Sequence, residues 1–342
     1  MLRYNGFAAV KLLIWLAGLA VLAGVVVALT SPPQFTLAEL QEKYATPESR
    51  FADIDGVRMH YMDQGSGPVI VLLHASFMNL RSWDAVAETL SSRYRVIRPD
   101  FLTAGLTGPE PNDEYTFDRN LELVQQLLRS LDVDRYALVG TSSGGIVAFN
   151  YAARFPDNVS RLILINSAGM PRNAKTNPNR VRGTWLSRWL DTRFPTRDKM
   201  RDILDINFIE PHEPPDWLVD MNFDMSRREG LQRAGAIMMA KFRTGDPQQV
   251  LAEITMPTLI MWGLDNQTVF HLEAEVFAHW LTGAASMVKK YPGLGHYAYV
   301  EEPAQIAGDI EKFLSGELDV QLIRHRRSQA PSPARQITNA KN

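Results

Sequence analysis

Ser142 lies in a stretch whose residue types suit nucleophilic catalysis. Residues 140–144, Gly-Thr-Ser-Ser-Gly, have the G-x-S-x-G pattern that places a serine on a sharp turn between a strand and a helix. Small residues are needed there because neighbouring backbone segments pass close to the turn. An apolar run precedes the motif and a helix-compatible run follows it, which favours a nucleophile over a glycine-rich turn without chemistry.

A serine hydroxyl attacks only when a base removes its proton and a third group orients that base. His296 is the best candidate for the base among the seven histidines, because it follows the last predicted strand in the glycine-flanked loop 293–296. His60 belongs to a predicted strand and is interpreted as structural. Four further histidines are interpreted as surface residues: His212, His271, His279 and His325.

Asp265 is the only carboxylate at the end of the strand predicted over residues 258–262. We predict that it orients His296, although an aspartate after a strand also serves commonly as a cap or turn residue. The order Ser142, Asp265, His296 is that of acyl-transfer enzymes built on alternating strands and helices.

An acyl-transfer site also needs two backbone N–H groups that stabilise the oxyanion. One is expected from Ser143, directly after the nucleophile, and the other from Ser76, in the loop after the strand predicted over residues 69–73. The sequence contains no cluster with metal-ligand spacing and no glycine-rich phosphate or dinucleotide loop after a strand. We therefore expect neither a metal nor a cofactor.

The composition is that of a globular protein and excludes several kinds of site. The 342 residues suffice for one large α/β domain with an insertion. A formal net charge of −2 provides no overall field for nucleic acid, and the absence of cysteine excludes disulfides, a cysteine nucleophile and thiolate metal sites. Residues 318–342 are basic and contain Ser and Pro, so we expect a disordered tail.

Residues 12–29 form an uncharged apolar run of 18 residues, which is long enough to cross a bilayer as a helix. Arg3 and Lys11 precede the run, which favours an N-terminus in the cytoplasm and the rest of the chain on the extracytoplasmic side, periplasmic or extracellular. We expect residues 1–31 to be a transmembrane anchor. The alternative is a signal peptide whose cleavage releases a secreted protein.

Predicted strands and helices alternate after residue 51, the pattern of a mostly parallel sheet. The pair Asp55-Gly56 predicts a hairpin between the first two strands. The alternation stops between residues 168 and 254, where aromatic residues and methionines are frequent. We expect a helical cap there, a core formed by residues 51–167 and 255–317, and a linker over residues 32–50 with a short helix at 37–44.

Together these motifs resemble the α/β-hydrolase superfamily over about residues 51–314, and within it the capped branch of serine esterases and meta-cleavage hydrolases. The resemblance implies an α/β-hydrolase fold, with a mostly parallel sheet of eight strands and a helical cap over the pocket. Epoxide hydrolases and dehalogenases of this fold use an aspartate nucleophile, so Ser142 argues against both. The stretches that carry the resemblance are residues 55–57, 60–61, 72–74, 95–100, 140–145, 262–263 and 295–296.

The sequence departs from the family pattern at two positions close to the predicted site. Ala75 stands where the family usually has glycine. The family's acid lies four residues after the tryptophan of W-G-x-x-D, and from Trp262 that register falls on Asn266 rather than Asp265. A shift of the loop by one residue would let Asp265 serve. Otherwise Asn266 takes the place of the acid, or another carboxylate serves.

We predict a membrane-anchored serine hydrolase that cleaves a carboxylic ester, or a related acyl bond, of a small apolar substrate through an acyl-enzyme. The aromatic and Met-rich cap favours an apolar, adaptable pocket. Two alternatives stay open. One is hydrolysis of a carbon–carbon bond of the meta-cleavage product type, and the other is a non-catalytic ligand-binding protein of the same fold.

Overall fold

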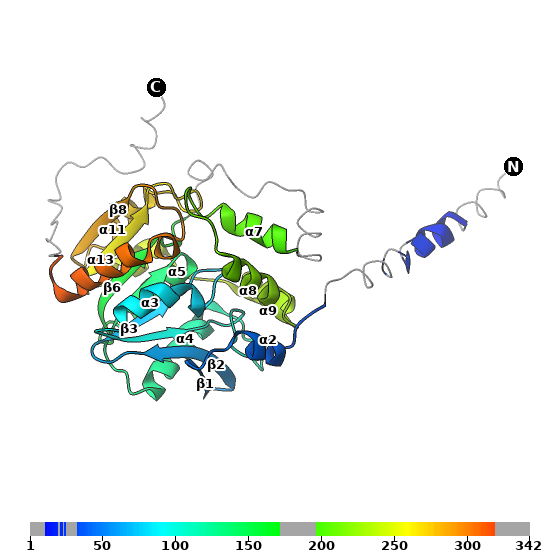
Figure 1. Cartoon of the computed structure of the whole chain (residues 1–342), viewed down its shortest axis with the longest axis horizontal. Coiled ribbons are helices and arrows are strands. Elements are labelled where there is room, and N and C mark those ends of the chain that lie inside the picture. Colours follow the sequence, from blue (N-terminus) through cyan, green and yellow to red (C-terminus); the bar gives the residue numbers. More distant parts are fainter. Residues whose placement is uncertain (1–10, 20, 23, 25–32, 172–195, 319–342) are drawn as a thin grey trace, which may run out of the picture.

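A sheet of eight strands forms the centre of the protein, and helices cover both of its faces (Figure 1). The computed structural model describes residues 11–19, 21–22, 24, 33–171 and 196–318. The strand order is β1-β2-β4-β3-β5-β6-β7-β8. The strand β2 is antiparallel to both of its neighbours, and all other pairs are parallel. The predicted fold class is therefore confirmed.

The elements follow one another in the expected alternation. The strands are β1 (Ser49–Ile54), β2 (Val57–Gln64), β3 (Val69–Leu73), β4 (Arg95–Pro99), β5 (Tyr136–Thr141), β6 (Val159–Ile165), β7 (Thr258–Gly263) and β8 (Ser286–Tyr291). The helices of the core are η1 (Leu80–Trp83), α3 (Asp84–Leu90), α4 (Phe117–Ser130), α5 (Ser143–Arg154), α11 (Glu273–Trp280), α12 (Ala298–Glu301) and α13 (Pro303–Ser315). Between β6 and β7 lie α7 (Arg197–Asp205), α8 (Asp216–Ser226), α9 (Leu231–Lys241) and α10 (Pro247–Ala252).

The central strands are apolar on both faces because each face supports a separate core. In β3, Val71 and Leu73 belong to the core under α4, α5 and α11, whereas Ile70 and Leu72 belong to the core under α3 and α13. Side chains of a strand alternate between the two faces, so a strand buried on both sides is a continuous apolar run. Because both faces of the central strands are apolar, polar residues that could take part in a reaction lie at the ends of these strands.

The predicted hairpin joins β1 and β2 at the sheet edge. Ile54 pairs with Val57, and both residues of the two-residue turn have positive φ, 45° at Asp55 and 82° at Gly56. That combination belongs to the turn whose twist matches the two strands. The Asp-Gly pair therefore fixes the register of the first two strands.

The N-terminal linker contains the helix α2 (Leu37–Tyr44), which packs against the helical insertion. Phe35 forms a bridge to Arg228: its N–H donates to the carbonyl of Arg227, and its own carbonyl accepts from the N–H of Glu229. Leu40 is fully buried in a small apolar cluster with Leu106, Met221 and Met225. The linker is thereby part of the folded structure.

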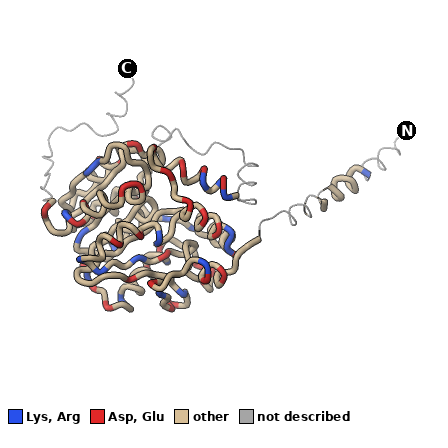
Figure 2. The backbone as a smooth tube through the Cα atoms, viewed as in Figure 1, with Lys and Arg blue, Asp and Glu red and all other residues tan. Residues whose placement is uncertain are grey.

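Ion pairs join two helices of the insertion, α7 and α8. Arg197 donates to Asp220 at 2.5 Å and to Asp216 at 2.7 Å, and Arg201 also pairs with Asp216. Figure 2 shows basic and acidic residues side by side along this part of the chain. Residues 172–195, which belong to the predicted cap, lie outside the described residues.

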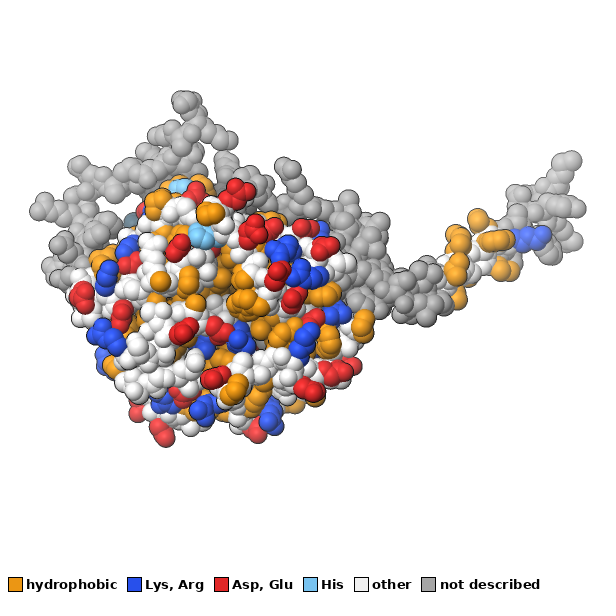
Figure 3. All heavy atoms as spheres, in the orientation of Figure 1, with side chains coloured by type: hydrophobic (Ala, Val, Ile, Leu, Met, Phe, Trp, Pro, Cys, Tyr) orange, Lys and Arg blue, Asp and Glu red, His pale blue; other side chains and the backbone are white. Residues whose placement is uncertain are grey.

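The predicted membrane anchor is described only in part. Residues 11–19 are helical, and their large apolar side chains are exposed (Figure 3). Within the described ranges, no helix has the length and apolar character needed to cross a bilayer. Residues 20, 23 and 25–29 of the predicted span lie outside those ranges, as does the predicted tail after residue 318.

Asp224 connects the linker to the insertion and provides a test of this packing. Its carboxylate accepts hydrogen bonds from Lys43, Tyr44 and Arg227, each at 2.6 Å. Burial raises the pKa of Asp224, but these three donors outweigh burial and lower it. Asp224→Ala removes an acceptor that three donors share, of which Arg227 is largely buried, so we expect it to reduce the free energy of unfolding by about 2 kcal/mol in urea titrations.

Asp220 on the same helix is the matched control. It is half-exposed and pairs with Arg197 near the surface. Exposed ion pairs contribute little, so Asp220→Ala should change the same free energy by less than about 0.5 kcal/mol. Equal losses in the two variants would contradict the role given to Asp224.

Candidate active site

Ser142 sits on a strained turn between β5 and α5. Its backbone has φ 51° and ψ −119°, a conformation that a non-glycine residue adopts only when its surroundings impose it. A Cβ on Gly140 would lie 2.3 Å from the carbonyl oxygen of Gly144, and a Cβ on Gly144 would lie 2.4 Å from that of His74. The two glycines of the motif therefore allow the close backbone contacts that hold Ser142 in this conformation.

His296 lies within hydrogen-bond distance of Ser142. Its Nε2 is 2.9 Å from the Ser142 Oγ, and both residues are buried, with 2% and 9% of their surfaces exposed. The two are 154 positions apart in the chain. They meet because β5 and β8 are parallel, so that the loops after their carboxyl ends lie on the same side of the sheet. Functional groups of open α/β sheets gather at these carboxyl ends.

Asp265 and His296 are not in hydrogen-bond contact. The Asp265 Oδ2 accepts the N–H of Gly293 at 2.7 Å, at the protein surface. The Nδ1 of His296 has no hydrogen-bond partner among the described residues. The loop after β8 presents the Gly293 N–H to Asp265, and the carboxylate is directed there instead of toward the imidazole.

Asn266 is buried, and the oxygen of its side-chain amide accepts two backbone hydrogen bonds. Its Oδ1 accepts the N–H groups of Thr268 at 2.9 Å and of Val269 at 3.0 Å. These two donors fix the orientation of the amide, because an NH₂ group cannot accept from them. The Nδ2 of Asn266 is buried and, within the described part of the chain, has no hydrogen-bond partner.

The two residues predicted to form the oxyanion hole lie next to each other. The Ser76 hydroxyl donates to the Ser143 Oγ at 2.8 Å, which joins the loop after β3 to the first turn of α5. The N–H groups of a first helical turn have no partner within the helix, so the Ser143 N–H is available to an incoming oxygen. The arrangement suits the stabilisation of negative charge beside Ser142.

Comparison with known proteins gives the same architecture. Residues 68–303 match the α/β-hydrolase-fold family. The chain belongs to this family. It is also similar to 2-hydroxy-6-oxo-2,4-heptadienoate hydrolase of Pseudomonas putida, with 27% identity over 271 residues that cover 77% of this chain and 94% of that enzyme.

Two other relatives differ in how much of the chain they match. A Mycobacterium tuberculosis protein of uncharacterised function is 36% identical over 129 residues, which cover 38% of each protein. The crystal structure of a membrane phospholipase A, described as a bacterial virulence factor, has 25% identity and a TM-score of 0.68, and covers 90% of this chain and 98% of its own. With Ser142 and His296 in contact, the chain is an α/β serine hydrolase.

Two residues that the sequence analysis did not single out fix the loops of this hydrolase site. His74 accepts the N–H of Phe101 on Nε2 at 3.2 Å, so its proton is on Nδ1, which contacts the carbonyl of Ala75 at 2.8 Å. Burial lowers the pKa of His74 and keeps it neutral. His74 therefore holds the loop that carries Ser76, and its position at the end of β3 was the available sequence signal.

Glu301, at the end of α12, is the second such residue. Its Oε2 accepts the N–H of Gly295 at 2.6 Å, one residue before His296, and its Oε1 has no hydrogen-bond partner among the described residues. Burial raises the pKa of Glu301 to about 7, although the backbone N–H of Gly295 opposes this shift. The carboxyl group supports the backbone of the histidine loop.

The histidine loop also contacts the insertion. The carbonyl of Asn207, after α7, accepts the N–H of His296 at 2.9 Å. The ring of Phe208 lies 5.7 Å from that of Tyr297. The insertion thus covers the histidine side of the site, in the place expected for a cap.

The structural and surface interpretations of the other histidines agree with their surroundings. His60 is buried, with Nδ1 2.6 Å from Asp100 and Nε2 2.9 Å from Ser49. His212, His271 and His279 are partly or fully exposed. His325 lies outside the described residues.

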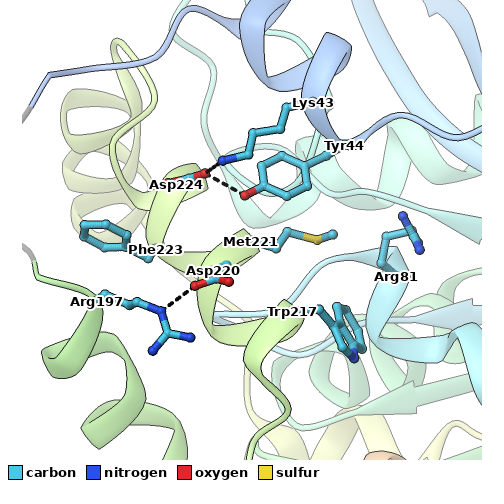
Figure 4. Close-up of a pocket in the computed structure, with 9 residues that line it drawn as sticks. All are labelled: Lys43, Tyr44, Arg81, Arg197, Trp217, Asp220, Met221, Phe223 and Asp224. Carbon is cyan, nitrogen blue, oxygen red and sulfur yellow. Dashed lines mark hydrogen bonds and ion pairs between the residues drawn. The ribbon is translucent and has the colours of Figure 1, made fainter.

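A cavity of about 530 Å³ lies between the linker, η1 and the insertion, and its lining includes none of the predicted site residues (Figure 4). Tyr44 and Met221 face its centre, and the Lys43–Asp224 pair closes one end. The remaining lining residues are Arg81, Arg197, Trp217, Asp220 and Phe223. The cavity belongs to the packing of the linker against the cap.

The burial of His296 predicts how the activity and the stability of the protein depend on pH. Burial, without an opposing carboxylate, lowers the pKa of its imidazole from 6.5 to about 3. The imidazole stays neutral as a base, so we expect kcat/KM for an uncharged substrate to be constant between about pH 5 and pH 8. Because the folded state binds fewer protons at this group, stability should fall as the pH drops below 6.5.

The measurement is a kcat/KM profile, with circular dichroism at each pH to confirm that the protein stays folded. A loss of half the activity near pH 6.5 in folded protein would show an ordinary, solvated histidine and contradict this prediction.

Proposed function

We propose that this α/β serine hydrolase cleaves a carboxylic ester, or a related acyl bond, of a small apolar substrate through an acyl-enzyme. The proposal depends on one observation: the Ser142 Oγ lies 2.9 Å from the His296 Nε2. Ser142 itself is on a strained turn where β5 ends and α5 begins. This is the relation between nucleophile and base that hydroxyl catalysis requires.

In the proposed reaction, the Ser142 Oγ attacks the carbonyl carbon while its proton passes to the His296 Nε2. The N–H groups of Ser76 and Ser143 stabilise the oxyanion that forms. The leaving oxygen departs with its electron pair and takes the proton from the His296 Nε2, which returns the imidazole to its neutral form. Water then attacks the acyl-enzyme, gives its proton to His296 and releases the acid, which restores the Ser142 hydroxyl.

An apolar ester is favoured by the residues around the site and by one of the relatives. Phe208 and Tyr297 are buried next to the histidine loop, and the cap supplies buried methionines such as Met200. Aromatic and thioether side chains suit apolar, adaptable pockets. The membrane phospholipase A, whose name denotes cleavage of a lipid ester, matches 90% of this chain.

The second candidate is hydrolysis of a carbon–carbon bond. It is supported by the similarity to 2-hydroxy-6-oxo-2,4-heptadienoate hydrolase over 77% of this chain. The same serine and histidine would serve either reaction. A ring-fission product and a set of esters, assayed side by side, separate the two: turnover of the ring-fission product alone would favour carbon–carbon cleavage.

We also propose that residues 12–29 anchor the protein in a membrane, with the hydrolase domain on the extracytoplasmic side. The uncharged run of 18 residues after Arg3 and Lys11 supports this orientation. Extraction of membranes at alkaline pH distinguishes an anchored protein, which stays in the pellet, from a secreted one.

Ser142→Ala tests the nucleophile. We expect loss of covalent labelling by a fluorophosphonate and a decrease of at least about 10³-fold in kcat on p-nitrophenyl butyrate, because no other group can form the acyl-enzyme. Ser130→Ala, at the far end of α4, is the matched control and should keep both properties. If wild type and Ser142→Ala hydrolyse the ester equally, the chain is a ligand-binding protein of this fold.

A further inference from the structure

The residues at the end of β6 hold the backbone of Ser142 from both sides. The Ser142 N–H donates to the carbonyl of Ile165 at 3.1 Å, and the N–H of Ala168 donates to the Ser142 carbonyl at 3.0 Å. The strand β6 lies next to β5 in the sheet, with Ile165 paired to Thr141. The strained turn that carries the nucleophile is therefore attached to residues 165–168.

Asn166, in the same segment, holds the loop of His296. Its Nδ2 donates to the carbonyl of Gly295 at 3.0 Å and to that of His296 at 2.9 Å, and its Oδ1 accepts the N–H of Gly263 at 2.9 Å. Asn166 is fully buried. Because the NH₂ group and the oxygen both have partners of the matching kind, the orientation of this amide is fixed.

Two features of this position favour asparagine. Its backbone has φ 45°, in the left-handed region that asparagine adopts more readily than most other non-glycine residues. The end of β7 also lies close to the histidine loop, because a Cβ on Gly263 would lie 2.3 Å from the carbonyl oxygen of Leu294 and 2.4 Å from that of Gly295. A short side chain with both a donor and an acceptor joins these backbone groups, whereas an ionised aspartate has no donor.

We infer that Asn166 is a positioning residue that sets the distance between the Ser142 Oγ and the His296 Nε2. It acts through the backbone of both residues and does not touch the reacting atoms. The inference rests on the proposed function, with Ser142 as nucleophile and His296 as base. Proton transfer needs the two atoms within hydrogen-bond reach, and a displacement of about 1 Å can lower a rate by about 10²-fold.

Other contacts of the histidine loop hold it relative to different elements. Glu301 of α12 accepts the N–H of Gly295, and the carbonyl of Asn207 in the insertion accepts the N–H of His296. The Asn166 amide instead connects the loop to the strand end that bonds to Ser142. Without this amide the loop stays attached to the protein, but its position relative to Ser142 is no longer fixed. The expected defect is therefore in kcat.

Asn166→Asp tests the inference because it keeps an oxygen for the Gly263 N–H and removes both donors to the histidine loop. We expect kcat on p-nitrophenyl butyrate to fall by about 10²-fold at pH 8, with KM within about threefold of the wild type. Burial beside two carbonyl oxygens raises the pKa of the introduced carboxyl, and its protonated form can donate one hydrogen bond. The loss should therefore shrink by at least about tenfold between pH 8 and pH 5.

The ratio of variant to wild type at each pH removes the contribution of groups that titrate in both proteins, Glu301 among them. Asn222→Asp is the matched control, since the buried Asn222 amide donates to the carbonyl of Leu218 at 2.8 Å within α8. This control should keep kcat within about twofold at every pH. A folded Asn166→Asp variant with kcat within about threefold of the wild type, or with a loss that does not shrink at low pH, would overturn the inference.

Asn166→Gly keeps the inference testable if Asn166→Asp does not fold. Glycine adopts the positive φ without strain, and its substitution removes all three bonds of the amide. We expect a similar loss of kcat, but without recovery at low pH because no carboxyl is introduced. An unchanged kcat in this variant would contradict the role given to Asn166.

A spectroscopic comparison separates this inference from the proposed function. With ring-¹⁵N histidine and His296→Gln for assignment, Ser142→Ala should shift the Nε2 signal of His296, because the contact with the hydroxyl is lost. In the Asn166→Gly background, Ser142→Ala should leave that signal unchanged, and an equal shift in both backgrounds would overturn the inference. Equal ester hydrolysis by wild type and Ser142→Ala would instead reject the proposed function, whichever shift is observed.

Discussion

The contact between the Ser142 hydroxyl and the His296 imidazole depends on a backbone that few residues could form. Ser142 is held with positive φ because β5 enters the turn, α5 leaves it, and Gly140 and Gly144 allow main-chain atoms to approach closely. Strain of this kind persists only where the surrounding structure imposes it. The sheet, its two cores and the covering helices together supply that constraint at one strand end.

The loops around this contact are held by hydrogen bonds to their backbone groups. His74 binds the carbonyl of Ala75, Glu301 binds the N–H of Gly295, and Asn207 of the cap binds the N–H of His296. Each bond sets where a neighbouring functional group lies, and two of the three come from buried titratable side chains. Burial lowers the pKa of the His296 imidazole and keeps it neutral, and among the described residues no carboxylate hydrogen-bonds to its ring.

Much of this arrangement could be predicted from the sequence because it depends on local patterns. The apolar run of residues 69–73 is β3, the helix expected at 37–44 is α2, and the Asp55-Gly56 pair forms the hairpin turn. The contact between Ser142 and His296 could be predicted because parallel strands have their carboxyl ends on the same side of the sheet. That neither Asp265 nor Asn266 hydrogen-bonds to His296 could not be predicted, since backbone N–H groups of Thr268, Val269 and Gly293 bind their side-chain oxygens instead. The role of Glu301 depends on its burial, which is a property of the tertiary structure.

The docking of the linker also determines where this protein can be shortened. A fragment that begins at residue 51, where the resemblance to the family begins in the sequence, would lack Leu40 and expose the apolar surface that this side chain covers on Met221 and Met225. It would also lose the bridge from Phe35 to Arg228. A recombinant fragment that begins at residue 33 keeps both contacts, and it also keeps the Pro33 carbonyl, which accepts a hydrogen bond from Arg227 at 3.4 Å.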